Sequence, residues 1–315
     1  MLSINNLKHK QIVIINATEN SFNLELDNIL IKDYNGSKIS KINLHNIFAI
    51  YLINGHSVTT NLIKRCKELG VSLLFMNSNF KVYSSIKPIA DGNYLLRQKQ
   101  YTLTEVEELK LTKLVLNNKF QNQKTLLKLK QFDLVDYLDY KSKLAEFNNF
   151  RELLGLEGII AKKFFEVYFN DLNWRRRAPR TKEDIPNLLL DIGYTYLFNY
   201  VDSILMLFGF DTYKGIYHKL FFARKSLSCD LIEPFRCIVD KALVKAYNLK
   251  QISPKDFKLD RNQSYYLSFQ NSKKYNQIFL TAIMHDKLEI FETIQSFYRH
   301  LMNPTENKYK PFKLK

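Results

Sequence analysis

The sequence predicts an α+β protein, in which a small, mostly β N-terminal domain with one helix precedes a larger, all-α domain. Two observations lead to this prediction: the first 86 residues contain short apolar and alternating runs, and the pattern becomes helical after about residue 94. A chain of 315 residues can bury a large core without disulfides. Its 46% hydrophobic and 25% charged residues are ordinary globular values, which excludes global disorder.

The strands and the helix of the N-terminal domain follow from local patterns. Residues 11–15 form a β-branched run, and residues 22–26 alternate between apolar and polar side chains, as a half-buried strand does. Residues 47–53 are continuously apolar, which is typical of a buried strand. Residues 58–69 have the spacing of an amphipathic helix, and Gly70 is a suitable residue to end it.

Changes of pattern along the chain set the expected domain boundaries. Residues 1–86 form the β-rich domain, which we expect to mediate dimerisation, and the Pro- and Gly-containing residues 87–93 form a linker. Residues 94–303 form the helical domain, where we expect the catalytic site. The helical pattern covers residues 94–130, 134–147, 150–171, 184–208, about 227–247, where Pro234 should bend the helix, and about 274–302. Residues 304–315 have four Lys, one Glu and no apolar period, so we expect a basic, flexible tail.

The charge of the chain points to a polyanionic partner. Lys and Arg number 47 against 31 Asp and Glu, a net charge of +16, which suits nucleic acid or an anionic membrane surface. The most apolar stretch, residues 196–210, is too short and too polar to cross a bilayer, so nucleic acid is favoured and no membrane role is expected. Three cysteines without a CxxC pair exclude a disulfide framework and a zinc ribbon, and they fit a cytoplasmic protein.

Three segments of the helical domain carry candidate catalytic residues. Glu157 lies in an apolar stretch between two glycines, His218 follows a Gly-rich and aromatic turn, and Asp230 and Glu233 share one face of a helix. Each has an ordinary structural explanation by itself: a carboxylate near a helix start, a hydrogen-bonded histidine and a solvated acidic pair. Together, however, carboxylates and one imidazole suit Mg²⁺ or Mn²⁺ better than zinc, and they are typical of metal-assisted phosphodiester chemistry.

Basic residues lie on both sides of these segments. Residues 174–182 contain five basic side chains, and further ones follow His218 and Glu233. An arginine run is usually a solvated surface, but beside a carboxylate cluster in so basic a chain, contact with phosphates is favoured. The residues that we expect to bind DNA are Arg175, Arg176, Arg177, Arg180, Lys219, Arg224 and Arg236.

Three ordered motifs resemble the CRISPR-associated integrase family, the first Cas protein of spacer acquisition. They read Leu-Glu-Gly-x-x-Ala at residues 156–161, Gly-Phe-Asp-x-x-x-Gly-x-x-His at residues 209–218, and Arg-x-Ser-Leu-x-x-Asp-Leu-x-Glu-x-Phe-Arg at residues 224–236. Residues 187–194 are similar to that family's Asn-x-Leu-Leu-x-x-Gly-Tyr helix. The resemblance covers nearly the whole chain and includes the order of a β-rich and a helical domain.

The resemblance implies roles for individual residues. Glu157, His218 and Glu233 would be the ligands of Mg²⁺ or Mn²⁺, with Asp230 as a supporting acid, although Asp230 and Glu233 could exchange these roles. Arg224 and Tyr194 would face the nucleic acid. The sequence departs from the family pattern at three positions, none of which is an implied metal ligand: Thr212 in place of a common Pro, Tyr217 in place of Leu, and Asp191 in place of Ser.

The resemblance also implies an activity and partners. The protein would be a DNA integrase and endonuclease that joins the 3′-hydroxyl ends of a double-stranded prespacer to the CRISPR repeat by metal-dependent transesterification, without ATP. It would act as homodimers that flank a small second Cas protein, and an end-trimming Cas nuclease is a further candidate partner. Two alternatives stay open: an endonuclease that cuts branched DNA with water as the nucleophile, and a non-catalytic nucleic-acid scaffold.

Overall fold

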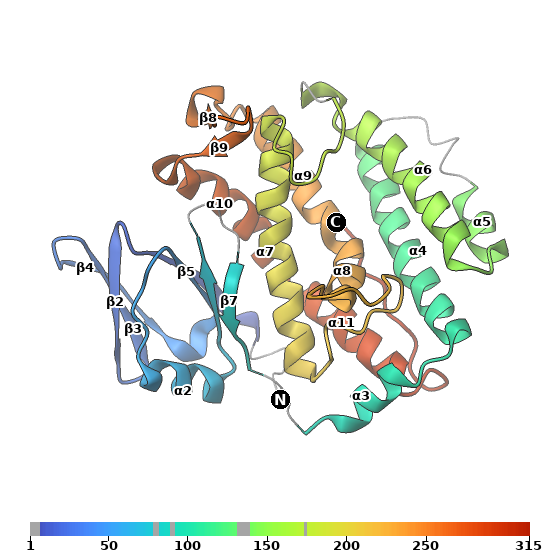
Figure 1. Ribbon diagram of the computed structural model, residues 1–315, viewed down its shortest axis with the longest axis horizontal. Helices are drawn as coiled ribbons and strands as arrows, with labels where there is room; N and C mark the ends of the chain where they lie inside the picture. The colour runs from blue at the N-terminus through green and yellow to red at the C-terminus, as the bar shows by residue number, and fades with distance from the viewer. Residues whose placement is uncertain (1–6, 78–81, 89–91, 131–138, 173–174) are drawn as a thin grey trace. The chain divides into compact units, whose positions relative to one another are not determined.

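The computed structural model describes residues 7–77, 82–88, 92–130, 139–172 and 175–315 (Figure 1). Contacts within the chain divide it into two compact units. The first comprises residues 1–93 together with 203–210, and the second comprises residues 94–202 and 211–315. The predicted α+β organisation is therefore confirmed, with strands in the first unit and mostly helices in the second.

The first unit contains two β-sheets. The larger sheet has four strands in the spatial order β1 (Gln11–Asn16), β5 (Ile47–Ile53), β6 (Ser72–Met76) and β7 (Val82–Ile86). β5 pairs in parallel with β1 and β6, whereas β7 is antiparallel to β6. The second sheet is an antiparallel meander of β2 (Asn20–Glu25), β3 (Asn28–Asp33) and β4 (Lys38–Asn43).

The prediction of a buried central strand and one helix in this unit is confirmed. All seven residues of β5 are buried, because the strand lies between β1 and β6 and its apolar side chains are covered on both faces of the sheet. Helix α2 (Thr60–Leu69) begins after Thr59, whose side chain accepts a hydrogen bond from the Leu62 amide. It ends at Gly70, which adopts the left-handed conformation with φ of 71°.

The second unit is built from helices and one hairpin. Its α-helices are α3 (Tyr94–Tyr101), α4 (Glu105–Leu129), α5 (Tyr140–Glu146), α6 (Phe150–Tyr168), α7 (Ile185–Phe208), α8 (Ser226–Ile232), α9 (Arg236–Asn248), α10 (Phe269–His285) and α11 (Lys287–Met302), and the last turns of α7 belong to the first unit. The 3₁₀ turn η4 (Glu233–Phe235) separates α8 from α9. The short hairpin of β8 (Phe257–Leu259) and β9 (Tyr265–Leu267) was not predicted.

Three of the expected helices are interrupted. The helix expected from about residue 274 to 302 is α10 and α11, which meet at Asp286. The helical pattern over residues 94–130 is two helices, because Thr104 forms a capping box with Glu107 and starts α4 afresh. The pattern from about residue 227 to 247 bends at Pro234, as its missing N–H requires, and becomes α8, η4 and α9. The helix expected from residue 134 to 147 lies partly outside the described residues, which contain only α5 of it.

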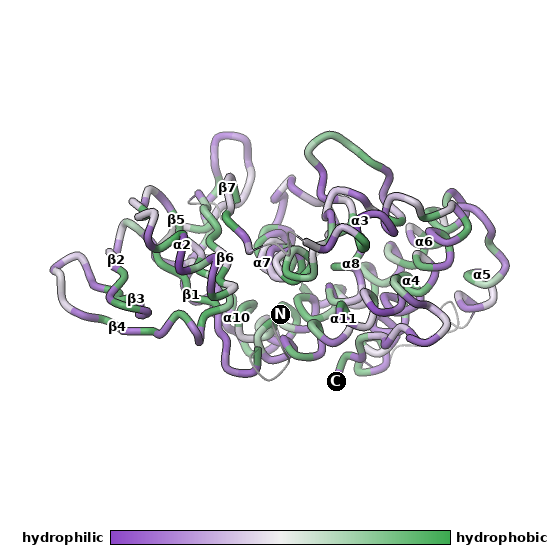
Figure 2. The backbone as a smooth tube through the Cα atoms, turned by 90° about the horizontal axis from the view of Figure 1, so that it is seen from below, coloured by the Kyte–Doolittle hydropathy of each residue, from purple (hydrophilic) through white to green (hydrophobic). Residues whose placement is uncertain are grey.

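Helix α7 is apolar around most of its circumference and lies in the core of the second unit (Figure 2). At Gly193 it approaches its neighbours closely: a Cβ atom there would come 2.5 Å from Val239 on α9 and 2.9 Å from Phe279 on α10. Only glycine permits this spacing. Among the described helices, none combines the length and the apolar character that a membrane crossing requires.

The last residues of the chain differ from the flexible tail that we expected over residues 304–315. Phe312 is 2% exposed and Leu314 is 9% exposed, and the backbone of this stretch is hydrogen-bonded to α4. The sequence did not predict these contacts, because the two buried side chains alternate with exposed lysines in a lysine-rich stretch.

Replacing Gly193 by Ala should destabilise the protein, because the new methyl group overpacks the contact with α9 and α10 at a cost of about 1–3 kcal/mol. The matched control is Gly158→Ala on α6, where no atom lies within 4 Å of the added Cβ. That change should stabilise the helix by about 0.5–1 kcal/mol. Thermal unfolding measures both, and melting temperatures that move in the same direction would contradict this account of Gly193.

Candidate active site

Asp230 holds the loop that presents His218. Its carboxylate is 1% exposed and accepts hydrogen bonds from the amides of Ile216 at 2.8 Å, Tyr217 at 3.1 Å and His218 at 3.1 Å. Gly215 lies so close to this carboxylate that a Cβ atom would come 2.8 Å from Asp230 Oδ2 and 2.6 Å from the His218 carbonyl oxygen. Gly215, the second glycine of the motif at residues 209–218, is therefore required for the loop to close around Asp230.

The same carboxylate orients the imidazole of His218. Nδ1 of His218 lies 2.5 Å from Asp230 Oδ1, so a proton on Nδ1 is donated to the carboxylate. The lone pair of Nε2 is then available for a metal ion or a proton, which is the usual arrangement of metal-binding histidines. The geometry fits Asp230 as the supporting acid, since its oxygens already accept the three loop amides and the imidazole.

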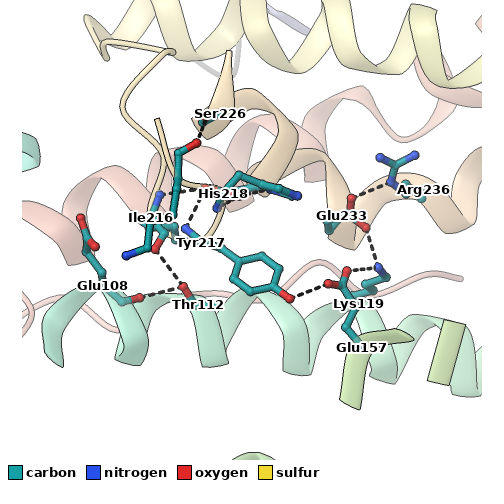
Figure 3. A network of polar contacts seen from close by, with 12 residues as sticks. Glu108, Thr112, Lys119, Glu157, Ile216, Tyr217, His218, Ser226, Glu233 and Arg236 are labelled. Atoms are coloured by element: carbon teal, nitrogen blue, oxygen red, sulfur yellow. Dashed lines mark hydrogen bonds and ion pairs between the residues drawn. The ribbon is translucent and has the colours of Figure 1, made fainter. Parts of the chain in front are cut away.

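Glu157 and Glu233 meet at one lysine (Figure 3). Nζ of Lys119, from the buried face of α4, lies 2.6 Å from Glu157 Oε1 on α6 and 2.7 Å from Glu233 Oε2 on η4. The lysine side chain is only 9% exposed. Three elements that lie far apart in the sequence thus contribute to one buried charge cluster, and α4 packs against both α6 and η4 to bring it together (Figure 1).

Two further side chains fix the other oxygens of these carboxylates. The Tyr217 hydroxyl donates to Glu157 Oε2 at 2.7 Å, and Arg236 Nε donates to Glu233 Oε1 at 2.8 Å. Burial would raise the pKa of Glu233, but the charges of Arg236 and Lys119 outweigh it and hold that pKa well below its usual value. Burial would likewise lower the pKa of Lys119, and the two glutamates raise it instead. Glu233, Lys119 and Arg236 are therefore charged at neutral pH.

The donor groups fit a hard divalent cation, although the described residues contain no ready-made cluster of three His, Cys, Asp or Glu in metal-binding geometry. Two carboxylates already converge on one cationic point, which Lys119 Nζ occupies. Glu233 Oε2 is buried and has no hydrogen bond of good geometry, so its 2.7 Å approach to Lys119 is an ion pair only. Carboxylate oxygens with one oriented imidazole are ligands that Mg²⁺ and Mn²⁺ accept.

Several of the expected DNA-binding arginines are engaged within the protein. Arg177 donates to Asn187 Oδ1 at 2.8 Å and to Asp191 Oδ1 at 2.6 Å, so the acid that departs from the family pattern anchors this arginine. Arg176 forms an ion pair with Glu183. Arg175 and Arg180 are exposed, and Trp174 in the same run lies outside the described residues. The role of this run in DNA binding stays a prediction.

Tyr194 is placed differently from what the resemblance implied for a residue that faces nucleic acid. It is 7% exposed, and its hydroxyl donates to the buried carboxylate of Asp240. Its ring lies between two guanidinium groups, 5.5 Å from that of Arg177 and 4.6 Å from that of Arg236. Tyr194 therefore supports Arg236, which in turn holds Glu233, from inside the unit.

The sequence interpretation missed an apolar and basic loop beside His218. Leu220, Phe221 and Phe222 are 64%, 73% and 93% exposed. The exposed residues Lys219 and Arg224, both expected to contact DNA, flank them. Three adjacent apolar residues without periodicity, directly after the histidine motif, were the available signal. Exposed rings among basic side chains suit contact with nucleic-acid bases.

Replacing Lys119 by Met should destabilise the protein at neutral pH, because Glu157 and Glu233 would lie side by side without the cation that both contact. Breaking a buried ion pair on one side costs about 3–5 kcal/mol, which lowers the melting temperature by roughly 10 °C. Lys110→Met, on the exposed face of the same helix, is the control. Equal melting temperatures for the two variants, in thermal unfolding at pH 7, would disprove this role of Lys119.

Replacing Asp240 by Asn should change how stability depends on pH. Burial raises the pKa of Asp240 to about 7, against the opposing hydrogen bond from Tyr194 and the charge of Arg236. The folded wild-type protein therefore binds this proton more tightly than the unfolded chain, and the associated stability is lost as the pH rises from about 4 through 7. The melting temperature of the variant relative to wild type should rise between pH 5 and pH 8. A constant difference would contradict the shifted pKa.

Comparisons with known proteins place the chain in a family. The profile of the family described as CRISPR associated protein Cas1 matches residues 13–280. A CRISPR-associated endonuclease Cas1 from Thermodesulfovibrio yellowstonii is 24% identical over 285 residues, which cover 85% of this chain and 90% of that protein. The CRISPR-associated endonuclease Cas1 of Thermotoga maritima is 22% identical over 278 residues, covering 84% and 87% of the two chains.

Solved structures share the fold. A Cas1 protein from Thermotoga maritima superposes with a TM-score of 0.82 at 18% identity, over 97% of this chain and 100% of that one. A casposase bound to its integration product gives 0.81 at 22% identity, over 96% and 94%. A Cas6-RT-Cas1–Cas2 complex gives 0.77 at 22% identity, over 98% of this chain and 36% of that chain. The family match spans all three sequence motifs, and the chain belongs to the CRISPR-associated Cas1 family.

Proposed function

We propose that this protein is a DNA integrase of CRISPR spacer acquisition, which joins the 3′-hydroxyl ends of a prespacer to the CRISPR repeat by metal-dependent transesterification. The observation that carries the proposal is the meeting of Glu157 and Glu233 at one cationic point in a Cas1-family chain of net charge +16. Relatives named as Cas1 endonucleases and the casposase bound to an integration product support the same class of chemistry.

The residues of the site would divide the work as follows. Glu157, Glu233 and the free Nε2 of His218 would hold Mg²⁺ or Mn²⁺, which stabilises charge on the reacting phosphate and favours deprotonation of the attacking hydroxyl. Asp230 keeps His218 in the tautomer that can act as a ligand. Arg236 and Tyr217 hold the two glutamates in place. One phosphodiester replaces another, so the reaction needs no ATP.

The surface next to Glu157 leaves room for a DNA backbone. Gly155 and Gly158 on α6 are exposed, and apart from the helix's own backbone no described atom lies within 4 Å of where their Cβ atoms would be. A strip without side chains, beside a catalytic carboxylate, permits close approach of a phosphate backbone. The exposed loop after His218 adds lysine, arginine and aromatic rings on which bases can stack.

The proposed partners are a second copy of this chain and the small second Cas protein. The solved Cas6-RT-Cas1–Cas2 complex, whose Cas1 portion shares this fold, supports the second Cas protein as a partner. Exposed apolar residues in the sheet of β2, β3 and β4, or beside it, support self-association of the N-terminal unit: Leu26 is 90% exposed and Ile39 is 55% exposed. We propose that Leu26 and Ile39 contribute to this contact between two copies.

The alternative is a metal-dependent endonuclease that uses the same residues to cut branched DNA without joining it. The names of the curated relatives favour this alternative, because they are called endonucleases. Water would then replace the 3′-hydroxyl as the nucleophile, and the product separates the two functions: joined strands or cut strands.

Strand transfer should depend on Glu157. A short duplex with free 3′-hydroxyl ends is mixed with a plasmid that carries a CRISPR repeat, with Mg²⁺, Mn²⁺ or EDTA and with or without the small Cas partner. Glu157→Gln should lower the rate of joining by at least about 100-fold, because a proposed ligand of the cation that stabilises charge on the reacting phosphate is lost, while DNA affinity stays unchanged. Glu166→Gln, an exposed change on the same helix, is the control.

Each outcome of this assay decides a different point. Metal-dependent joining by the wild type supports the integrase. Cutting without joining supports the endonuclease instead. If Glu157→Gln joins DNA at the wild-type rate, the assignment of the site is wrong.

A further inference from the structure

Two buried asparagines of α4, Asn118 and Asn122, form hydrogen bonds with residues 309–315. The amide group of Asn118 forms a pair of hydrogen bonds with Phe312: Nδ2 donates to the Phe312 carbonyl at 2.6 Å, and the Phe312 N–H donates to Oδ1 at 2.8 Å. The N–H of Leu314 donates to Asn122 Oδ1 at 3.0 Å. The asparagines thus pair with the backbone of residues 309–315 as a neighbouring strand would, although they belong to a helix.

Asn122 connects this stretch to the turn that carries Glu233. Its Nδ2 donates both to the Phe312 carbonyl at 3.1 Å and to the Pro234 carbonyl at 3.1 Å. The ring of Phe312 also packs edge-on against Phe235, with 5.2 Å between the ring centroids. Residues 309–315 therefore contact η4 directly through an aromatic pair and indirectly through a shared amide group.

These contacts lie next to Lys119 and Glu233 in the sequence. Asn118 precedes Lys119 in the sequence, and Asn122 lies one helical turn beyond Asn118 on the same face of α4. Pro234 follows Glu233 directly. The 2.7 Å separation of Lys119 Nζ and Glu233 Oε2 depends on the spacing between α4 and η4. Residues 309–315 are hydrogen-bonded to α4 and pack against Phe235 of η4.

We propose that residues 309–315 form a positioning strap, which sets the spacing of α4 and η4 and thereby the ability of Glu157 and Glu233 to share one cation. The inference rests on the proposed function, because it concerns the divalent cation of that site. The strap touches neither glutamate, so it acts through Asn118, Asn122 and Phe235. Its lysines do not carry this role: Lys313 is exposed and alternates with the buried Phe312 and Leu314.

Binding of Mn²⁺ to the full-length protein, measured by electron paramagnetic resonance without DNA, tests the strap. Phe312→Ala and Asn122→Ala should each weaken Mn²⁺ binding about tenfold and lower kcat for strand transfer, while KM for DNA and the helical content stay unchanged. Lys313→Ala, an exposed change on the strap, should behave as wild type. Phe312→Leu keeps an apolar side chain in the same place and should recover most of the Mn²⁺ affinity.

The outcomes separate the strap from the proposed function. If the wild type shows no Mn²⁺ binding that Glu157→Gln removes, the proposed function fails, and the strap inference fails with it. If the wild type binds Mn²⁺ through Glu157 but Phe312→Ala and Asn122→Ala bind it equally well, residues 309–315 only stabilise the fold, and the strap inference alone is overturned. Should Phe312→Ala not fold, Asn118→Ala replaces it, with the same expected weakening of Mn²⁺ binding.

Discussion

Two buried carboxylates that share one ammonium group are the constraint on which the helical unit depends. Both side chains are largely removed from water, so a carboxylate at either place needs a compensating charge at close range. Lys119 supplies it to both at once. Since these residues come from α6, η4 and α4, the ion pairs have good geometry only if the three elements are held at fixed distances.

The rest of the unit supplies that rigidity through ion pairs and hydrogen bonds that surround Glu157 and Glu233. Arg236 neutralises Glu233, packs on the ring of Tyr194, and lies near the buried Asp240 that accepts the tyrosine hydroxyl. On the other side, Tyr217 binds Glu157 from a loop that Asp230 holds through backbone amides. A polar network of this kind is costly when any member is unpaired, which favours one arrangement of the helices over others.

Sequence patterns predicted what depends on neighbours in the chain and missed what depends on distant partners. The β5 strand, the Gly70 helix end and the bend at Pro234 followed from local composition. Lys119 did not, because its partners lie 38 and 114 residues away and a lysine in an amphipathic helix is normally solvated. The three acids and the histidine were predicted as one site from ordered motifs, whereas the hydroxyl of Tyr217 was seen only as a departure from the family pattern.

The strap has a consequence for the order in which the protein is made. Helix α4, the loop of His218 and η4 leave the ribosome well before residues 309–315. A nascent chain therefore carries the charged residues of the site before it carries the segment that contacts both α4 and η4. Under the proposed function, a chain interrupted before residue 309 would hold the ligands of the site without the segment that fixes their spacing.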